Sequence, residues 1–539
     1  MRVGLLTEGG YPYAAGEGGE WCDQLVRGLD QHDFEVYALS RCARQERGGW
    51  YGLPKQVRRV RTAPLWGDPA EGGTGRAYGA YGRRERQRFG EHFSELAAAI
   101  CAMEPPGAAE PARTDGEVAP AGSAGAQAYR FTDALHGLAD LAREAGGLGA
   151  AFRSEQALRA LEAACRAPGA HPAAHGIRVA DLLAVSALLE RSLRPLSLDW
   201  YGAAEGDRGL AGVDLCHATS AGPAALPGLL AKRFFGTPLL VTEYEVRLRA
   251  HYLSSAAGAA GISLAVRTLV AAFHRLLSAE VYGGADLITP GDAHVRRWQE
   301  RCGADRARVR TVHPGVDERP YESVGEGAEE PSGAPADDGR TLVWAGGRAE
   351  PWLWEAFAAL REAEPVARLR VVGTPLPGTE APEGVSYEEA VRPETYAAGS
   401  VVVLAAAVDA FPLPLVEAMF CGRATVSQDA GAVREVIGGT GLVVPPRDPR
   451  ALADACLGLL RDPGRRARLG AAARARALEL FTVERHVTAF RGIYLELISR
   501  APVRHDTGDP SVPFSHAAES HPPLSWSPRA TSPTWAGRS

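Results

Sequence analysis

The chain has 539 residues, a net charge of -6 and an apolar content of 45%. This length predicts two or three domains, because a single hydrophobic core stops growing at roughly 250 to 300 residues. The acidic charge and the lack of any basic block argue against nucleic-acid binding, and no apolar stretch approaches the roughly 20 residues that span a bilayer.

Eight cysteines are scattered along the chain, and none forms a C-x-x-C pair. The pattern therefore indicates neither a zinc site nor a redox motif, and we interpret these residues as buried free thiols in a reducing cytoplasm. The N-terminus starts directly with an apolar strand and shows no signal-peptide pattern, so a cytoplasmic location is expected.

The first 40 residues have the order strand, glycine-rich loop, helix, strand. Apolar runs at Val3–Leu6 and Phe34–Leu39 predict the strands, and the helical spacing begins at Trp21. This order opens a Rossmann-like unit. The dinucleotide fingerprint is weak, because Trp21 stands where its third glycine belongs. The loop around Gly16 is predicted to approach a ligand phosphate, with a plain turn as the alternative.

Two stretches interrupt this first unit. Residues 104–127, rich in Ala, Pro, Gly and Glu, are predicted to be a disordered insertion. Residues 131–193, rich in Ala, Leu and Arg, are predicted to be a helical elaboration of the first domain.

Strand patterns then return at Asp214–Ala218 and Pro238–Thr242. The second strand is followed at once by polar and aromatic side chains. Ligands bind at the carboxyl ends of strands in open α/β sheets, so Glu243, Tyr244 and Arg249 are candidate site residues. The alternative is a surface loop with a weak Glu–Arg pair.

The rest of the first half is predicted to consist of two helices, a long amphipathic stretch and two short strands. The ranges are Ala225–Phe235 (a helix between the preceding strands), Ile262–Ala285 (a long amphipathic stretch), Leu287–Thr289 (strand), Asp292–Cys302 (helix) and Val309–Val312 (strand). We place the first domain at 1–318 and an acidic, apolar-poor linker at 319–340.

The strand–helix alternation restarts at residue 341 and predicts a second Rossmann-like domain over 341–485, a terminal helix over 486–500 and a disordered tail over 501–539. Its predicted strands are Leu342–Ala345, Leu369–Val372 (followed by Gly373), Val401–Ala407 and Ala424–Ser427, and its predicted helices are Asp448–Leu460, Arg465–Leu480 and Val483–Ile498. Two such α/β domains are expected to face each other across a ligand-binding cleft.

The stretch 409–435 carries four carboxylates on a strand–loop–helix frame: Asp409, Glu417, Asp429 at the start of the glycine-containing loop, and Glu435. Backbone N–H groups at such a frame can hold a phosphate or a developing anion.

This stretch resembles the signature of the family 4 retaining glycosyltransferases, which have the GT-B fold. The matching residues are Asp409, Phe411, Glu417, Ala418-Met419, Cys421-Gly422, Asp429, Gly431, Glu435 and Gly441 to Pro446. The N-terminal stretch TEGGYPYAAGEGGEWCDQLVRGL resembles the subgroup that includes the pellicle-polysaccharide glycosyltransferases of exopolysaccharide synthesis.

The resemblance implies roles for individual residues. Arg348 and Asp409 are implied to be catalytic: the first stabilises the leaving phosphate and the second contacts the donor sugar. Glu417 is implied to accept from the ribose hydroxyls. Further donor-binding residues are Gly16, Phe411, Leu413, Gly373 and Glu435, and contacts with the donor sugar or the acceptor are assigned to Tyr244, Glu243 and Tyr11.

The implied function is transfer of a hexose from a nucleoside diphosphate sugar, with UDP-hexose as the expected donor, to a saccharide or other hydroxyl acceptor with retention of configuration. No cofactor is expected, and no metal, because no Asp-x-Asp motif is present. The enzyme is expected to be cytoplasmic, in peripheral association with a polysaccharide-synthesis complex.

Four positions depart from the family pattern: Asp409 replaces Glu, Leu353 replaces Lys, Glu17 replaces Gly and Tyr244 replaces His. They leave open the alternative of a degenerate glycosyltransferase-like protein that binds a sugar nucleotide or a partner enzyme without transfer. A sugar-nucleotide epimerase or a phosphorylase of the same architecture is a further alternative.

Overall fold

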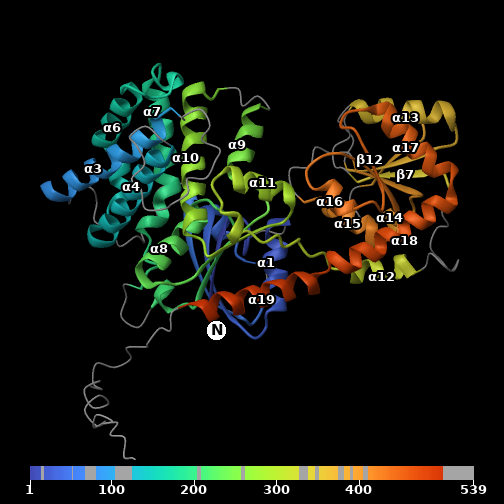
Figure 1. Cartoon of the computed structure of the whole chain (residues 1–539), viewed down its shortest axis with the longest axis horizontal. Coiled ribbons are helices and arrows are strands. Elements are labelled where there is room, and N and C mark those ends of the chain that lie inside the picture. Colours follow the sequence, from blue (N-terminus) through green and yellow to red (C-terminus); the bar gives the residue numbers. More distant parts are fainter. Residues whose placement is uncertain are drawn as a thin grey trace, which may run out of the picture. The chain divides into compact units, whose positions relative to one another are not determined.

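The fold is seen in a computed structural model (Figure 1). The residues that it describes are 1–13, 17–50, 52–66, 81–103, 124–202, 208–256, 261–326, 338–345, 351–373, 382–388, 392–404 and 411–501. The predicted insertion at 104–127 lies outside these residues except for its last four, which begin helix α4. The predicted tail lies outside them except for Ala501.

The first half contains a parallel six-stranded sheet with the order β3-β2-β1-β4-β5-β6. Its strands are β1 (Arg2–Glu8), β2 (Asp33–Cys42), β3 (Val57–Trp66), β4 (Leu215–Ala218), β5 (Leu239–Glu243) and β6 (Leu287–Pro290). The apolar runs are buried on both faces, as parallel strands require. This is the doubly wound nucleotide-binding order. The predicted α/β class is therefore confirmed, although β3 was not predicted.

The second half repeats the same order. Its sheet runs β12-β11-β10-β7-β8-β9, and every pairing is parallel. The strands are β7 (Thr341–Trp344), β8 (Arg368–Val372), β9 (Val385–Glu388), β10 (Val401–Leu404), β11 (Ala424–Gln428) and β12 (Leu442–Val444). Counted from β7, the order is again 3-2-1-4-5-6, so both halves are Rossmann-like units.

The helices of the first half cover both faces of its sheet. They are α1 (Glu17–Gly28), α2 (Ala43–Arg47), α3 (Arg83–Cys101), α4 (Ala124–Ala145), α5 (Leu148–Phe152), α6 (Glu155–Arg166), α7 (Val179–Leu193), α8 (Leu226–Phe235), α9 (Arg247–Ala256), α10 (Leu264–Gly284) and α11 (Ala293–Arg301). Helices α3 to α8 and α10 share one continuous core with the sheet. The predicted helical elaboration thus begins earlier than expected, with α3.

The helices of the second half pack on its sheet in the same manner. They are α12 (Arg319–Glu326), α13 (Pro351–Ala363), α14 (Pro393–Ala397), α15 (Leu413–Phe420), α16 (Val433–Ile437), α17 (Pro449–Arg461) and α18 (Pro463–Leu480). Helices α13 and α17 cover one face, whereas α15, α16 and α18 share a cluster on the other side. None of the helices that the structure describes is long and apolar enough to cross a membrane.

Helix α12 occupies the first part of the predicted linker. Its apolar side chains explain the difference, because Tyr321 stacks on Phe420 with ring centroids 6.1 Å apart and Val324 is buried beside Val343 and Tyr396. The acidic composition of the whole segment concealed these two anchoring residues.

The strand predicted at Val309–Val312 is wrong. Only a single bridge joins Val309 to Ile288 of β6. The backbone N–H groups of Arg310 and Val312 donate to the carbonyls of Ile288 and Pro290 at 2.9 Å each. Proline has no N–H to return, so the ladder does not extend past Pro290.

The last helix, α19 (Val483–Arg500), returns to the first half and lies beside α1 (Figure 1). Its apolar residues, among them Phe490 and Tyr494, share a core with Val3 and Leu5 of β1. The sheet faces this core with alternate residues of each strand, as the two-residue period dictates.

A buried polar network joins α19 to the sheet. His217 of β4 contacts the Tyr494 hydroxyl through Nδ1 at 2.7 Å and the Thr242 hydroxyl through Nε2 at 2.6 Å. Thr242 in turn contacts Thr289 at 2.6 Å. Each member has a partner, so the polar groups are satisfied within an apolar layer.

We predict that Tyr494→Phe lowers the free energy of unfolding by about 1–3 kcal/mol, because it leaves a buried nitrogen of His217 without a partner. Urea denaturation of the full chain measures the change. Tyr129→Phe is the matched control, since the Tyr129 side chain is 72% exposed and its loss of a hydroxyl should change stability by less than about 0.5 kcal/mol. Equal effects of the two substitutions would contradict the prediction.

Three buried histidines predict the pH dependence of stability. Burial lowers the pKa of His217 and of His274 to about 3 and that of His486 to about 4. The unfolded chain binds these protons below a pKa of about 6.5, but the folded chain does not. Stability is therefore retained at neutral pH and lost as pH falls, by about 2 kcal/mol per histidine between pH 7 and pH 5.

Urea titrations across this range should show the decline, and His217→Gln should remove about one third of it. A stability that stays constant between pH 7 and pH 5 would rule out the assigned burial.

Candidate functional site

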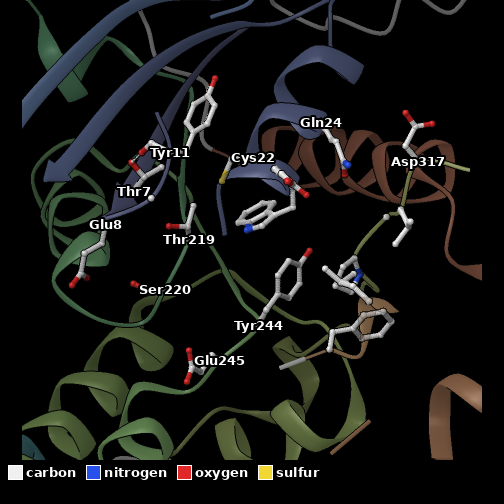
Figure 2. A pocket seen from close by; sticks show the side chains of 18 of the residues that line it. Thr7, Glu8, Tyr11, Cys22, Gln24, Thr219, Ser220, Tyr244, Glu245 and Asp317 are labelled. Carbon is white, nitrogen blue, oxygen red and sulfur yellow. Dashed lines mark hydrogen bonds between the residues drawn. The ribbon is translucent and has the colours of Figure 1, made fainter. Parts of the chain in front are cut away.

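A cavity of about 610 Å³ lies at the carboxyl end of the first sheet, where the strand order reverses between β1 and β4 (Figure 2). Loops that follow these two strands diverge at this point and leave a crevice, which is where doubly wound folds bind ligands. The second half closes the cavity with residues of α12 and α15 and with Phe411, which lies two residues before α15. Its size suits a small-molecule ligand.

The lining residues come from segments far apart in the sequence. They are Thr7, Glu8, Gly10, Tyr11, Glu20, Trp21, Cys22, Gln24, Thr219, Ser220, Tyr244, Glu245, Arg247, Ala250, Pro314, Gly315, Val316, Asp317, Pro320, Tyr321, Phe411, Leu413 and Glu417. Five predicted site residues are therefore brought together: Tyr11, Tyr244, Phe411, Leu413 and Glu417.

Trp21 and Tyr244 form the centre of the first-half wall. Their rings meet edge to face with centroids 5.2 Å apart, and the Trp21 indole also packs on His486 of α19 at 6.3 Å. The Tyr244 hydroxyl is buried and has no hydrogen-bond partner among the residues that the structure describes. Burial raises the pKa of Tyr244 well above its ordinary value, so it stays a neutral donor and acceptor.

Tyr11 is held in place by a hydrogen bond to its backbone carbonyl. The Thr7 hydroxyl donates to the Tyr11 carbonyl at 2.7 Å, which folds the loop after β1 back on the strand. This bond positions the Tyr11 side chain at the cavity next to α1.

Glu417 of α15 faces the cavity from the second half. The Tyr396 hydroxyl donates to Glu417 Oε2 at 2.7 Å, and the Tyr321 hydroxyl forms a second hydrogen bond with this carboxylate. Burial and the nearby carboxylate raise the pKa of both tyrosines. Two neutral hydroxyls thus orient a carboxylate without neutralising it.

Phe411 lies just before α15. Its ring packs on Phe481 and His313, with centroids 5.7 Å and 5.9 Å away. This apolar contact joins the start of α15 to the segment that connects the two halves.

Glu243 does not line the cavity, contrary to the prediction. Its side chain is only 1% exposed. The carboxylate accepts hydrogen bonds from the Tyr282 hydroxyl, from Gln299 at 3.3 Å and from the backbone N–H of Ala221 at 3.3 Å. Successive strand residues point to opposite sides, so Tyr244 lines the cavity while Glu243 braces the loop after β4.

Glu435 also lies outside the cavity lining. Its carboxylate accepts from the backbone N–H of Ala293, the first residue of α11, at 2.7 Å, and lies 3.7 Å from His313 Nε2. The contact with a helix N-terminus is electrostatically favourable. Glu435 therefore joins the two halves and is not seen at a donor site.

Gly373 follows β8 and does not line the cavity. Its φ of 138° is a conformation that side chains avoid, and its N–H donates to the Glu388 carbonyl at 2.8 Å. The glycine is explained by this turn.

The predicted residues Gly16, Arg348 and Asp409 lie outside the described residues. Leu353, where the family pattern has lysine, lies on α13 with 3% exposure in an apolar core. Its side chain faces the core, so a lysine there would have to be buried without a partner.

Several lining residues were not predicted. Glu8 is the last residue of β1, Ser220 follows β4, and Arg247 rather than Arg249 lines the cavity. Their signal was close to the one used for Tyr244, a polar residue at or just past the end of a buried strand. Among the described residues, no group of three or more His, Cys, Asp or Glu side chains is arranged to hold a metal ion.

Glu243 is buried and Glu245 is exposed, so substituting each of them tests where the structure places the two carboxylates. We predict that Glu243→Ala lowers the free energy of unfolding by about 1–3 kcal/mol, because it leaves buried donors without an acceptor. Glu245→Ala, at the exposed neighbouring carboxylate, should cost less than about 0.5 kcal/mol. Urea denaturation of both variants decides, and a larger loss for Glu245→Ala would refute the placement.

Comparisons with known proteins follow the same division into halves. Residues 1–307 match the family described as "Domain of unknown function (DUF3492)", and residues 340–462 match "Glycosyl transferases group 1". Among solved structures, sucrose-phosphate synthase from Thermosynechococcus elongatus superposes with a TM-score of 0.52 at 15% identity, covering 92% of this chain and 99% of that one. Anabaena HepE in complex with UDP gives 0.50 at 13%, covering 92% and 100%.

Curated relatives align with a smaller part of this chain. The D-inositol 3-phosphate glycosyltransferase of Kineococcus radiotolerans is 32% identical over 237 residues, 37% of this chain and 54% of that protein. The protein of the same name from Kribbella flavida is 28% identical over 277 residues, 46% and 63%. The chain therefore matches less than two thirds of the length of these relatives.

The structural matches agree with the GT-B fold that the two repeated sheets predict. The chain belongs to the family of the domain of unknown function DUF3492, and its second half carries a glycosyltransferase group 1 domain.

Proposed function

We propose that this chain is a retaining glycosyltransferase that moves a hexose from a nucleoside diphosphate sugar, UDP-hexose first among them, to a hydroxyl acceptor. The observation that carries the proposal is the position of Glu417. It lies in a cavity shared by two sheets of nucleotide-binding topology, held by tyrosine hydroxyls.

The fixed carboxylate suits recognition of a ribose. A carboxylate accepts hydrogen bonds but donates none, and adjacent hydroxyls of a ribose are donors that it can pair with. The bond from Tyr396 restricts the carboxylate to one orientation, so little freedom is lost on binding. HepE, a protein of the same fold, was solved with UDP.

The chemistry requires charge stabilisation more than proton transfer. In transfer with retention, the sugar–diphosphate bond breaks while an acceptor hydroxyl attacks from the same face. Positive charge develops on the sugar ring and negative charge on the leaving phosphate. We propose Asp409 near the sugar and Arg348 at the phosphate, on the sequence pattern alone.

We extend the proposal to the setting of the enzyme. The resemblance of the N-terminal stretch supports a role in exopolysaccharide synthesis on the cytoplasmic side, in association with a polysaccharide-synthesis complex and without a metal. A protein that binds the sugar nucleotide without transfer remains the alternative.

The test is to incubate the full chain with a panel of sugar nucleotides and an acceptor extract, and to measure released nucleoside diphosphate. Calorimetry with UDP runs in parallel. Turnover supports the proposal, tight binding without turnover supports the alternative, and neither binding nor turnover by folded protein contradicts both.

Glu417→Gln should weaken UDP binding about tenfold, because a hydrogen bond to a charged acceptor becomes one to a neutral acceptor. Glu479→Gln, at an exposed residue of α18 that does not line the cavity, is the control and should leave affinity unchanged. If the affinity of Glu417→Gln for UDP is unaltered, Glu417 does not bind the ribose.

A further inference from the structure

The charge of the cavity wall constrains what can bind opposite the donor. Among the lining residues that the structure describes, five are carboxylates and one is a cation. The carboxylates are Glu8, Glu20, Glu245, Asp317 and Glu417, and the cation is Arg247. Figure 2 shows Glu8, Ser220 and Glu245 together at one side of the cavity, away from Asp317.

Arg247 is already neutralised by a carboxylate of the same wall. Its Nη2 lies 2.5 Å from Glu8 Oε1, and the two side chains are 34% and 16% exposed. The guanidinium also packs closely against Gly222, where an added Cβ would meet Arg247 Nε at 2.7 Å. Arg247 is thus wedged between a glycine and a carboxylate, and it is not available to bind a ligand anion in the way an unpaired arginine would be.

Polar atoms on this wall still need partners. Glu8 Oε2, Ser220 Oγ and Arg247 Nε are buried, and none of the three has a hydrogen bond to another described residue. Such atoms are rare in folded proteins because they cost free energy, so this wall is built to be completed by a ligand or by water. Because Arg247 Nε packs against Gly222, the set offers a ligand one acceptor, Glu8, and the Ser220 hydroxyl, which can donate or accept.

A sugar or polyol hydroxyl matches this set, whereas a phosphate does not. The hydroxyl can donate to Glu8 and accept from Ser220. A phosphate monoester carries about two negative charges near neutral pH and has few or no donors. It would place a second anion beside Glu8 and Glu245, and like charges brought together across an interface are strongly unfavourable.

We propose that the wall formed by Glu8, Ser220, Glu245 and Arg247 is the acceptor subsite, and that it takes a sugar or polyol free of phosphate and other acidic groups. This rests on the proposed glycosyltransferase function. It distinguishes the chain from the curated relatives whose names specify D-inositol 3-phosphate. A free cation to receive that phosphate is lacking among the described lining residues.

The experiment compares two matched pairs of compounds, glucose with glucose 6-phosphate and myo-inositol with inositol 3-phosphate. Saturation-transfer NMR on the full chain with UDP present measures binding, and release of nucleoside diphosphate from the active donor measures transfer. We expect each neutral compound to bind at least about tenfold more tightly than its phosphorylated partner. Equal or tighter binding of the phosphorylated compounds, or no binding of any of the four, would overturn the proposal.

Charge reversal at the exposed residue Glu245 tests whether repulsion by the wall carboxylates causes the preference for neutral compounds. Glu245→Lys should reduce the preference for the neutral compound at least threefold, whereas Glu479→Lys, the same change on α18, should not. An unchanged preference in Glu245→Lys would overturn the electrostatic argument. Ser220→Ala should weaken binding of the neutral compounds, and unaltered binding would count against the wall as the subsite.

The two readouts separate the two proposals. If neutral compounds bind with the expected preference but no donor is consumed, the binding specificity of the wall stands, while the transferase function and with it the acceptor role fail. If transfer occurs only to phosphorylated acceptors, the function stands and the subsite fails.

Discussion

The contact of α19 with the first sheet is the constraint on which the rest of the molecule depends. His217 uses both ring nitrogens, one toward Tyr494 of α19 and one toward Thr242 of β5, so a shift of the helix would leave a buried polar atom unpaired. Helix α19 follows the second half in the sequence but packs on the first half. The chain therefore crosses between its halves twice. The two crossings lie side by side, because the Val316 N–H donates to the Phe481 carbonyl at 2.8 Å and His486 contacts the His313 carbonyl at 2.9 Å.

These crossings also form part of the cavity. Pro314 to Asp317 line it, and Trp21 of α1 packs on His486 at the start of α19. The same apolar layer that fixes α19 thus positions an indole at the centre of the candidate site. Glu435 adds a polar contact between the halves at the N-terminus of α11. The wall residues from the first half and Glu417 from the second are therefore held in register by packing and hydrogen bonds outside the cavity.

Much of the fold follows from the sequence because parallel strands buried on both faces have to be apolar along their whole length. That is why β1, β5 and β8 appear within two residues of their predicted ends. Val309–Val312 has the same pattern, but its partner strand ends in a proline. Glu243 and Tyr244 show the limit for the site: sequence places both at a strand end, and only the orientation of the strand in the sheet decides which of them faces the cavity.

The carboxylates of the cavity act in two different ways according to what holds them. Glu417 is oriented by neutral hydroxyls and presents acceptor oxygens to donors on a ligand, while the Glu8 carboxylate forms an ion pair with Arg247. Both arrangements favour hydroxyl-bearing ligands over anions. The diphosphate of a donor would then have to be held by groups outside the described lining, which is the role that the sequence pattern gives to Arg348. Recognition of hydroxyls and stabilisation of the leaving phosphate are in this way assigned to separate parts of the chain.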